Sequence, residues 1–162
     1  MNKSAVPKVS FALIGDVQFA DREPWAGRVF RESRVLLHET IHELNGKNLD
    51  FIVSLGDLGD GLAKSEVPAI LEEYAKSAHP VKYVAGNHDF VKNSEEELKR
   101  LFGLDDLFYT FKAGGIEFIV LNGLDVSRFA PPGSKRYAQY EEDKIEHPWR
   151  KLREWDGMLS AE

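Results

Sequence analysis

The sequence predicts an α/β fold in which helices cover a mainly parallel sheet. Short apolar segments typical of buried strands alternate with longer segments whose apolar residues recur at helical spacing. Each apolar segment is followed by a polar loop that contains glycine. Because parallel strands need a crossover connection, which is usually a helix, this alternation predicts a β-α-β-α-β order. A further helix and then a hairpin are expected after it.

The alternating elements occupy the first half of the chain. A short apolar run bounded by turn residues is typical of a buried strand, and an apolar stripe at helical spacing is typical of a surface helix. On these criteria the expected strands and helices alternate as residues 9–15, 28–45, 51–55, 65–78 and 81–84. Asn45 and Gly46 form a C-terminal signal for the first helix, and Pro80 ends the second.

Two further local signals follow the third predicted strand. Ser94 and Glu97 fit a capping box, which predicts a helix that runs to Gly103. Gly114 and Gly115 separate two segments of strand-like composition and predict a hairpin turn. The hairpin strands are expected at residues 108–112 and 116–121.

Composition excludes several classes of function. The chain has 162 residues, with 27 acidic and 21 basic side chains and a formal net charge of −6. No nucleic-acid partner is expected, because such binding needs clustered Lys and Arg. The absence of cysteine removes disulfides, zinc–thiolate sites and cysteine nucleophiles. The apolar run near the N-terminus is too short for a membrane span, so no membrane association is expected and the default location is cytoplasmic.

Polar clusters follow all three predicted parallel strands. The carboxyl ends of parallel strands meet at one edge of a sheet, where ligands bind. The oxygen-bearing side chains of these clusters are therefore expected to converge, and they are Asp16, Gln18, Asp57 and Asn87. Carboxylate and amide oxygens suit manganese, magnesium or iron better than soft metals. The sequence thus predicts a metal site at this edge, and bound cations would let an acidic chain accept a small phosphorylated substrate.

His88 is the candidate for proton transfer in this cluster. A histidine close to a phosphate can stabilise the transferring group or protonate the leaving oxygen. A neighbouring carboxylate can orient the ring and raise its pKa, and Asp89 is the candidate for that role. His88 and Asp89 are therefore the candidate catalytic residues.

Three sequence blocks follow the predicted strands in order. They read Asp16-Val17-Gln18, Gly56-Asp57-Leu58-Gly59-Asp60 and Gly86-Asn87-His88-Asp89. Together they resemble the first three signature blocks of the calcineurin-like metallophosphoesterases, most of which have histidine at the position of Gln18. The Asp-x-Gln form, with Phe19-Ala20-Asp21 behind it, resembles the manganese-dependent ADP-ribose/CDP-alcohol diphosphatase branch. Residues 120–127 and 155–160 also resemble segments of that branch.

The resemblance implies a fold and a metal centre. The implied fold is a sandwich of two mixed sheets flanked by helices, of which this chain carries about the first half. The implied ligands are Asp16 and Gln18 for a first cation, Asp57 as a bridge and Asn87 for a second. The resemblance makes His88 a contact to the phosphate or leaving group, with Asp89 as its orienting partner and Asp60 behind the ligands.

The resemblance also implies an activity. Two divalent cations would serve the hydrolysis of a phosphoester or phosphoanhydride. Manganese is the first expectation for the metal, with iron, magnesium and zinc as alternatives. The implied substrate is a nucleoside diphosphate-linked compound such as ADP-ribose or a CDP-alcohol.

The end of the chain departs from the family pattern. The family has downstream histidine blocks that supply further metal ligands, and this chain has neither. Ser160 has the features of a helix start, yet only two residues follow it. Residues 1–162 are therefore expected to form a single, C-terminally incomplete domain that lacks its second half. The alternative is a catalytically incomplete fold that binds metal, phosphate or a partner without turnover.

Two other residue groups have possible roles in binding or catalysis. Arg22 and Trp25 lie in the loop after the first block and are candidate contacts for a substrate phosphate or base. His38 and His42 belong to His-Glu-Thr-Ile-His, which resembles the zinc-protease motif. The helix that carries them has a strong apolar stripe that must pack on the sheet, and no third ligand is evident. A protease is therefore not expected.

Overall fold

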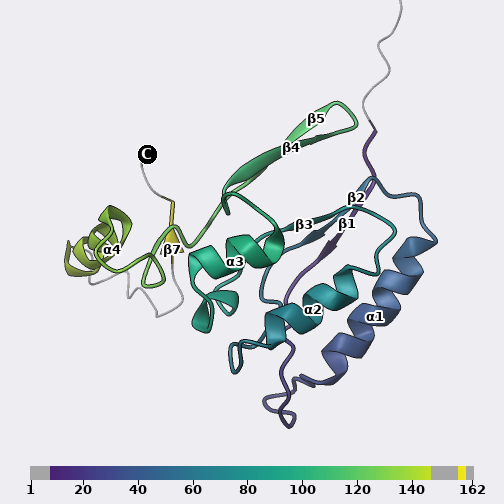
Figure 1. Ribbon diagram of the computed structural model, residues 1–162, viewed down its shortest axis with the longest axis horizontal. Coiled ribbons are helices and arrows are strands. Elements are labelled where there is room, and N and C mark those ends of the chain that lie inside the picture. Colours follow the sequence, from purple (N-terminus) through teal and green to yellow (C-terminus); the bar gives the residue numbers. More distant parts are fainter. Residues whose placement is uncertain (1–7, 147–156, 160–162) are drawn as a thin grey trace, which may run out of the picture.

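A three-stranded parallel sheet forms the centre of the computed structural model, which describes residues 8–146 and 157–159 (Figure 1). Its strands lie in the order β1-β2-β3. They are β1 (Phe11–Ile14), β2 (Phe51–Ser54) and β3 (Val81–Tyr83). The crossovers contain α1 (Glu32–Asn45) and α2 (Glu66–Tyr74). The predicted parallel β-α-β-α-β unit is therefore confirmed.

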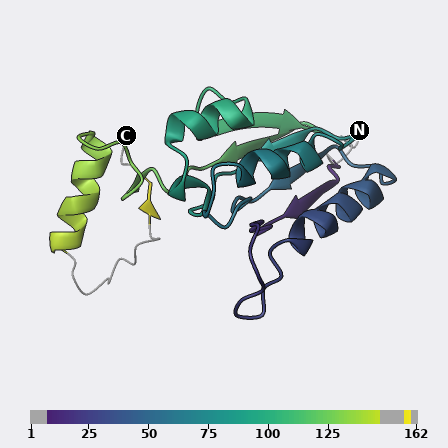
Figure 2. The same cartoon turned by 60° about the horizontal axis from the view of Figure 1, so that its bottom comes forward.

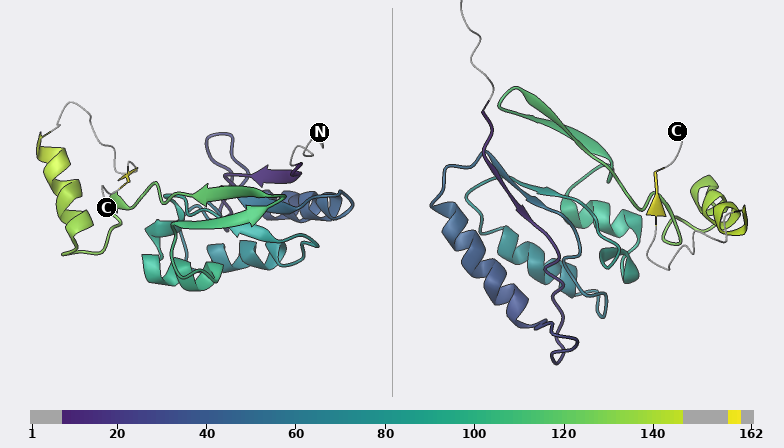
Figure 3. Two further views of the ribbon diagram at one scale, coloured as in Figure 1. Left: turned by 90° about the horizontal axis from the view of Figure 1, so that it is seen from above. Right: turned by 180° about the vertical axis from the view of Figure 1, so that it is seen from behind.

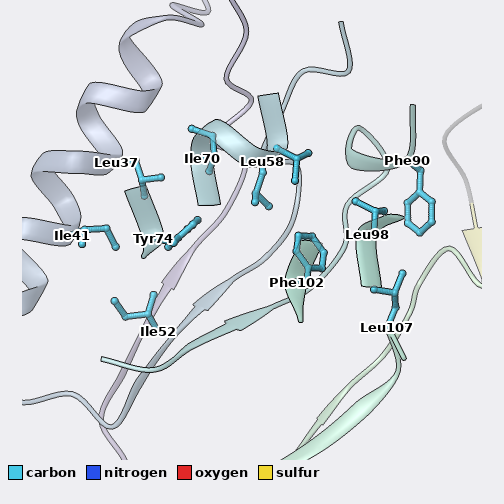
Figure 4. Close-up of a cluster of buried hydrophobic side chains, with 11 residues drawn as sticks. Leu37, Ile41, Ile52, Leu58, Ile70, Tyr74, Phe90, Leu98, Phe102 and Leu107 are labelled. Atoms are coloured by element: carbon cyan, nitrogen blue, oxygen red, sulfur yellow. The ribbon is translucent and has the colours of Figure 1, made fainter. Parts of the chain in front are cut away.

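The helices cover one face of this sheet. α3 (Glu95–Phe102) joins α1 and α2 on that face, as Figure 2 shows. Side chains from the three helices, from β2 and from the segments that follow β2, β3 and α3 form one buried cluster (Figure 4). Its members are Leu37, Ile41, Ile52, Leu58, Val67, Ile70, Tyr74, Phe90, Leu98, Phe102 and Leu107. Burial of such side chains contributes roughly 1.5–3 kcal/mol each, so this layer holds the strands in register.

The predicted capping box and hairpin are both confirmed. The side chain of Ser94 accepts a hydrogen bond from the backbone of Glu97, whose side chain bonds back to Ser94, and Gly103 ends α3 in the left-handed conformation. The strands β4 (Tyr109–Ala113) and β5 (Ile116–Val120) pair antiparallel.

The hairpin packs against the sheet face that the helices leave open. Phe51 of β2 is the centre of this contact, with its ring centroid 5.0 Å from that of Phe111 and 5.1 Å from that of Phe118. Further along the same face the cover is incomplete, since Leu13 is 57% exposed and Leu55 is 49% exposed. The two faces of the parallel sheet therefore differ sharply in how well they are packed.

Tyr109 of the hairpin also caps the outer edge of β3. Its hydroxyl donates to the backbone oxygen of Tyr83 at 2.9 Å and accepts from the backbone nitrogen of Tyr83 at 3.0 Å. One side chain thus makes both hydrogen bonds that a neighbouring strand would make at this residue.

Two element boundaries differ from the predictions. α1 begins at Glu32 rather than at residue 28, because Trp25 and Arg28 pair with each other across a turn in which Ala26 is left-handed. The charged segment of residues 141–155 has a composition that predicts partial helix, and its described part belongs to α4 (Lys135–Glu146), which starts before residue 141. The remainder of that segment and the helix start expected at Ser160 lie outside the described residues.

The last elements lie at one end of the molecule, away from the parallel sheet (Figure 3). The short strands β6 (Val126–Ser127) and β7 (Gly157–Met158) pair antiparallel, and α4 packs beside β6. Arg136 connects α4 to α3 through a hydrogen bond of 2.9 Å to Glu95. Within the described residues, no helix is both long and apolar enough to cross a membrane.

Candidate functional site

Backbone hydrogen bonds join the loops that follow β1 and β2. The nitrogen of Gln18 donates to the oxygen of Asp57 at 2.8 Å, and the nitrogen of Phe19 donates to the oxygen of Leu58 at 3.0 Å. The two loops therefore continue side by side beyond the strands, as parallel extensions of the sheet. This pairing brings the first and second sequence blocks to the same edge, as the sequence predicts.

Three predicted ligands have an unusual backbone conformation. Four non-glycine residues in the described part of the chain have positive φ, and three of them are Asp16 (53°), Gln18 (45°) and Asp57 (52°). Left-handed backbone at a non-glycine residue costs on the order of 1–3 kcal/mol and persists only where the surroundings enforce it. Such strain concentrates at functional sites, so its coincidence with the predicted ligands supports the site.

The Asp57 carboxylate lies against a surface that only glycine allows. A Cβ atom on Gly86 would lie 2.1 Å from Asp57 Oδ1, which is closer than atoms can approach. The same oxygen accepts a hydrogen bond of 2.9 Å from the backbone nitrogen of His88. Asp57 is thus held between the second and third loops, in a position suited to a bridging ligand.

The electrostatics of this cluster fit a cation. Burial raises the pKa of Asp57, and the nearby negative charge of Asp16 raises it further. Hydrogen bonds from His88 and Gln18 act in the opposite direction. A bound divalent ion would favour the ionised form of Asp57 at this half-buried position.

The donor set also fits hard divalent cations. Asp16, Gln18, Asp57 and Asn87 all offer oxygen, which suits manganese or magnesium. Among the described residues no group of three or more His, Cys, Asp or Glu is placed to hold a metal ion. A site here therefore depends on the amide oxygens of Gln18 and Asn87 as well as on carboxylates. Asn87 directly precedes the His88 amide that bonds Asp57, which places it at the same edge.

Asp89 has a different place from the one predicted. It is 0% exposed, and its carboxylate accepts backbone hydrogen bonds from Leu58 at 2.8 Å, Gly86 at 2.9 Å and Asp57 at 3.0 Å. The expectation that it orients His88 is corrected, because its oxygens face the backbone of the second and third loops. Asp89 therefore fixes the shape of the loops that carry the ligands.

Asp60 takes the position beside the histidine. The Nδ1 atom of His88 lies 3.0 Å from the backbone oxygen of Asp60 and 3.7 Å from its Oδ1. A carbonyl oxygen only accepts, so Nδ1 must carry the proton in this contact. The side chain of Asp60 is 8% exposed, so this carboxylate is largely buried beside the histidine.

The two predicted substrate contacts are placed differently from each other. Arg22 Nη1 donates to Asp60 Oδ2 at 3.2 Å, so this cation is paired within the protein. Trp25 is 63% exposed at the tip of the same loop. A pocket of about 180 Å³ lies nearby, against Asp16 and Gln18.

Glu66 is a site residue that sequence reasoning missed. It is 3% exposed, and its carboxylate accepts backbone hydrogen bonds from Gly61, Leu62 and Ala63. A Cβ atom on Gly59 would lie 2.8 Å from Glu66 Cβ, so glycine is needed at that contact. The available signal was an acidic residue in the first turn of a helix that directly follows a glycine-rich loop.

The His-Glu-Thr-Ile-His motif of α1 has a role in helix packing. His38 Nδ1 lies 3.0 Å from Glu73 Oε2 of α2, and Ile41 between the two histidines is 1% exposed in the core. The motif therefore serves the packing of α1 on α2.

Comparisons with known proteins agree with the blocks described above. The model of the calcineurin-like phosphoesterase family matches residues 9–158. A manganese-dependent ADP-ribose/CDP-alcohol diphosphatase from Arabidopsis thaliana is 30% identical over 142 residues, which are 78% of this chain and 46% of that protein. The enzyme of the same name from Danio rerio is 26% identical, over 94% of this chain and 54% of its own. The chain thus spans about half the length of these relatives.

A solved structure shows the same fold. The crystal structure of a dimetal phosphatase from Danio rerio superimposes with a TM-score of 0.81 at 23% sequence identity. The match covers 96% of this chain and 62% of that one. The α/β fold inferred from the sequence is therefore confirmed.

Proposed function

Because this chain belongs to the calcineurin-like phosphoesterase family, we propose that it is a metal-dependent hydrolase of phosphoester or phosphoanhydride bonds. The strained backbone at Asp16, Gln18 and Asp57 is the observation that carries this proposal. These left-handed residues lie at the ends of two neighbouring strands. A need to aim oxygen atoms at common cations explains them.

The proposed substrates are nucleoside diphosphate-linked compounds such as ADP-ribose or a CDP-alcohol. Support comes from the relatives named for these substrates, which match this chain at 26–30% identity. The Asp-x-Gln form of the first block adds to that support. The pocket beside Asp16 and Gln18 offers room for part of such a substrate.

The proposed ligands divide between two divalent cations. Asp16 and Gln18 would hold the first, Asn87 the second, and Asp57 would be shared. Manganese is the proposed metal, as in the names of the relatives. When bound, the cations would lower the pKa of a water and polarise the phosphoryl oxygens.

The protein's own residues would assist the departure of the leaving group from the phosphate. Because Nδ1–H of His88 makes a hydrogen bond to the backbone oxygen of Asp60, Nε2 is the nitrogen left for the substrate. In the doubly protonated ring, Nε2–H would donate its proton to the leaving oxygen and leave the neutral ring with its proton on Nδ1. Asp89 and Glu66 keep the loops in the shape that presents these groups, since their carboxylates bind loop amides. Burial of both carboxylates makes this support rigid.

Hydrolysis assays with an Asp57→Asn variant test the proposal. The wild-type chain is expected to hydrolyse ADP-ribose or a CDP-alcohol with Mn²⁺ and to lose this activity when the metal is chelated. Asp57→Asn is expected to abolish turnover, because it removes the shared negative charge. Asp105→Asn, the same change at an exposed carboxylate, is the matched control. Unchanged turnover in Asp57→Asn would refute the two-metal assignment.

A second candidate function is cation or phosphate binding without turnover. It is favoured by the scarcity of charged ligands, because no group of three or more His, Cys, Asp or Glu in the described segments can hold a metal. Calorimetric titration with Mn²⁺ separates the two functions. Two tight equivalents support the enzyme, whereas one weak equivalent that Asp57→Asn removes supports simple binding.

A further inference from the structure

Arg22 lies beside the proposed catalytic histidine, yet it is bound to the protein itself. We propose that Arg22 is a positioning residue that acts through Asp60 to hold the His88 ring in one tautomer and one orientation. The proposal rests on the proposed function, in which His88 serves the leaving group. It replaces the expectation that Arg22 contacts the substrate.

The first step is the ion pair between Arg22 and Asp60. Arg22 Nη1 lies 3.2 Å from Asp60 Oδ2, and the Asp60 side chain is only 8% exposed. A carboxylate so poorly solvated depends on its charged partner more than a surface carboxylate does. A substrate phosphate would have to compete with Asp60 for this cation.

Aromatic rings fix the direction from which Arg22 approaches. The Cζ atom of Arg22 is 4.7 Å from the ring centroid of Phe30 and 5.7 Å from that of Trp25. Phe30 is 2% exposed, so the nearer ring belongs to the core and cannot move away. Cation–π contacts of this kind restrict the guanidinium to a small region above the rings.

Asp60 passes this restraint on to His88. The Nδ1 atom of His88 donates to the backbone oxygen of Asp60 at 3.0 Å, and Asp60 Oδ1 lies 3.7 Å from the same nitrogen. Both oxygens favour a proton on Nδ1, which leaves Nε2 as the nitrogen that takes part in proton transfer. If the Asp60 carboxylate turned away, His88 Nδ1 would lose its contact with Oδ1. The loop that holds the backbone oxygen of Asp60 against Nδ1 would also become less rigid.

Arg28 provides a comparison within the same cluster. Its Nη1 lies 3.9 Å from Asp60 Oδ1, beyond hydrogen-bond distance, and its side chain is 51% exposed. Arg28 therefore adds positive charge without fixing the carboxylate. Of these two arginines, Arg22 is the one that combines a hydrogen bond to Asp60 with a contact to the core.

Nuclear magnetic resonance of His88 tests the proposal without any need for activity. Long-range ¹H–¹⁵N spectra of the full chain, at a fixed pH where the ring is neutral, distinguish the two tautomers. The wild type is expected to show the Nδ1–H tautomer alone, and Arg22→Gln a mixture of both. Arg22→Lys, which keeps a cation within reach of Asp60, is expected to recover most of the wild-type pattern.

Arg31→Gln is the matched control for a general loosening of the loop. Arg31 bonds Asp21 at 2.6 Å and Glu23 at 2.7 Å, so its loss frees the same loop but leaves the Arg22–Asp60 contact in place. Its spectrum is expected to match the wild type. A wild-type spectrum for Arg22→Gln, or an equal change in Arg31→Gln, would overturn the proposal.

Leaving-group dependence separates positioning from substrate binding. Arg22→Gln is expected to lower kcat about tenfold or more for ADP-ribose but little for bis(p-nitrophenyl) phosphate, whose leaving group needs no proton. A rise in KM without a change in kcat would instead make Arg22 a substrate contact and refute the proposal. If the wild type hydrolyses neither compound, the proposed function fails, and the tautomer spectra still decide the role of Arg22.

Discussion

The loops that carry the predicted metal ligands and the helical layer each contain a carboxylate that is nearly removed from solvent. Asp89 lies among the loops and is 0% exposed, whereas Glu73 lies on α2 and is 4% exposed. Burial of a charged carboxylate costs several kcal/mol in lost solvation unless partners in the protein compensate for it. The two regions compensate in different ways.

The loops compensate with backbone dipoles. Asp89 accepts hydrogen bonds from the amides of Asp57, Leu58 and Gly86, and none of these groups carries a net charge. Burial raises the pKa of Asp89 to about 6, although the backbone hydrogen bonds oppose the shift. The carboxylate is thus used to join two loops, at the expense of its own ionisation.

The helices compensate with opposite charges. Glu73 bonds Arg34 at 2.8 Å, lies 3.0 Å from His38 and also pairs with Lys76. Burial alone would raise the pKa of Glu73, but these hydrogen bonds lower it to about 2. This carboxylate stays ionised and connects α1 to α2.

The two carboxylates therefore have different roles. Asp89 fixes the shape of the loops, whereas Glu73 stabilises the packing of α1 on α2. The donors to Asp89 carry no net charge, so they do not neutralise its negative charge close to the predicted ligands. A cationic partner at Asp89 would have neutralised that charge. In the helical layer, Glu73 is compensated by full ion pairs.

The largest expected effect is that of Asp89→Ala. Its removal leaves three loop amides without their acceptor, so the free energy of unfolding is expected to fall by about 3–5 kcal/mol in urea denaturation. Asp106→Ala removes an exposed carboxylate that accepts one bond from Phe108 and is expected to cost less than about 1 kcal/mol. A loss of similar size in both variants would contradict the joining role of Asp89.

Glu73→Gln is expected to have a smaller effect. Its partners are themselves a third to a half exposed, so the loss of charge is expected to lower the free energy of unfolding by about 1–2 kcal/mol. Glu72→Gln is the matched control, because Glu72 bonds the same Arg34 but is 70% exposed. Its expected cost is below about 0.5 kcal/mol, and equal costs for the two variants would refute the importance of burial at Glu73.

The contribution of Glu73 is also expected to depend on pH. Its pKa is about 2 in the folded chain against 4.5 for an unperturbed glutamate, so the folded state holds this proton less tightly. The stabilisation is therefore complete above the unfolded value and is lost as the pH falls through about 2. Denaturation of the wild type and Glu73→Gln across this range measures the difference. A gap that stays constant down to the acid limit would contradict the assignment.

The smallest expected effect has the opposite sign. Asp16→Gly is expected to raise the free energy of unfolding by about 0.5 kcal/mol, because glycine adopts the φ of 53° without strain. The same change is expected to weaken Mn²⁺ binding, since a ligand is lost. Asp105→Gly, at a position without positive φ, is expected to be neutral or destabilising. A loss of stability in Asp16→Gly would argue against strain at this loop.

The sequence predicts the parallel unit, the capping box and the hairpin because each depends on local signals. These signals are the spacing of apolar residues and turn or cap residues such as Ser94 and Gly114. They can be recognised from the neighbouring sequence, without knowledge of distant contacts. The blocks that carry the proposed ligands are equally local, and parallel topology brings them to one edge. The identity of each ligand stays a prediction.

The partners of Asp89 and Arg22 were not predictable in this way. Asp89 follows His88 in the chain, but neighbouring side chains need not face each other, and the approach of the loop after β2 decides its contacts. Arg22 pairs with Asp60, which lies 38 positions away, only because the first two loops run side by side. The late start of α1 likewise depends on the pairing of Trp25 with Arg28.

The hydroxyl of Tyr109 bears on the colloidal behaviour of the protein. An open strand edge offers its backbone groups to any other chain and can template intermolecular pairing. At the edge of β3, the nitrogen and oxygen of Tyr83 are already bonded to this hydroxyl. An approaching strand therefore gains no backbone hydrogen bond at Tyr83. The Tyr109 side chain thus opposes intermolecular strand pairing at this edge of the sheet.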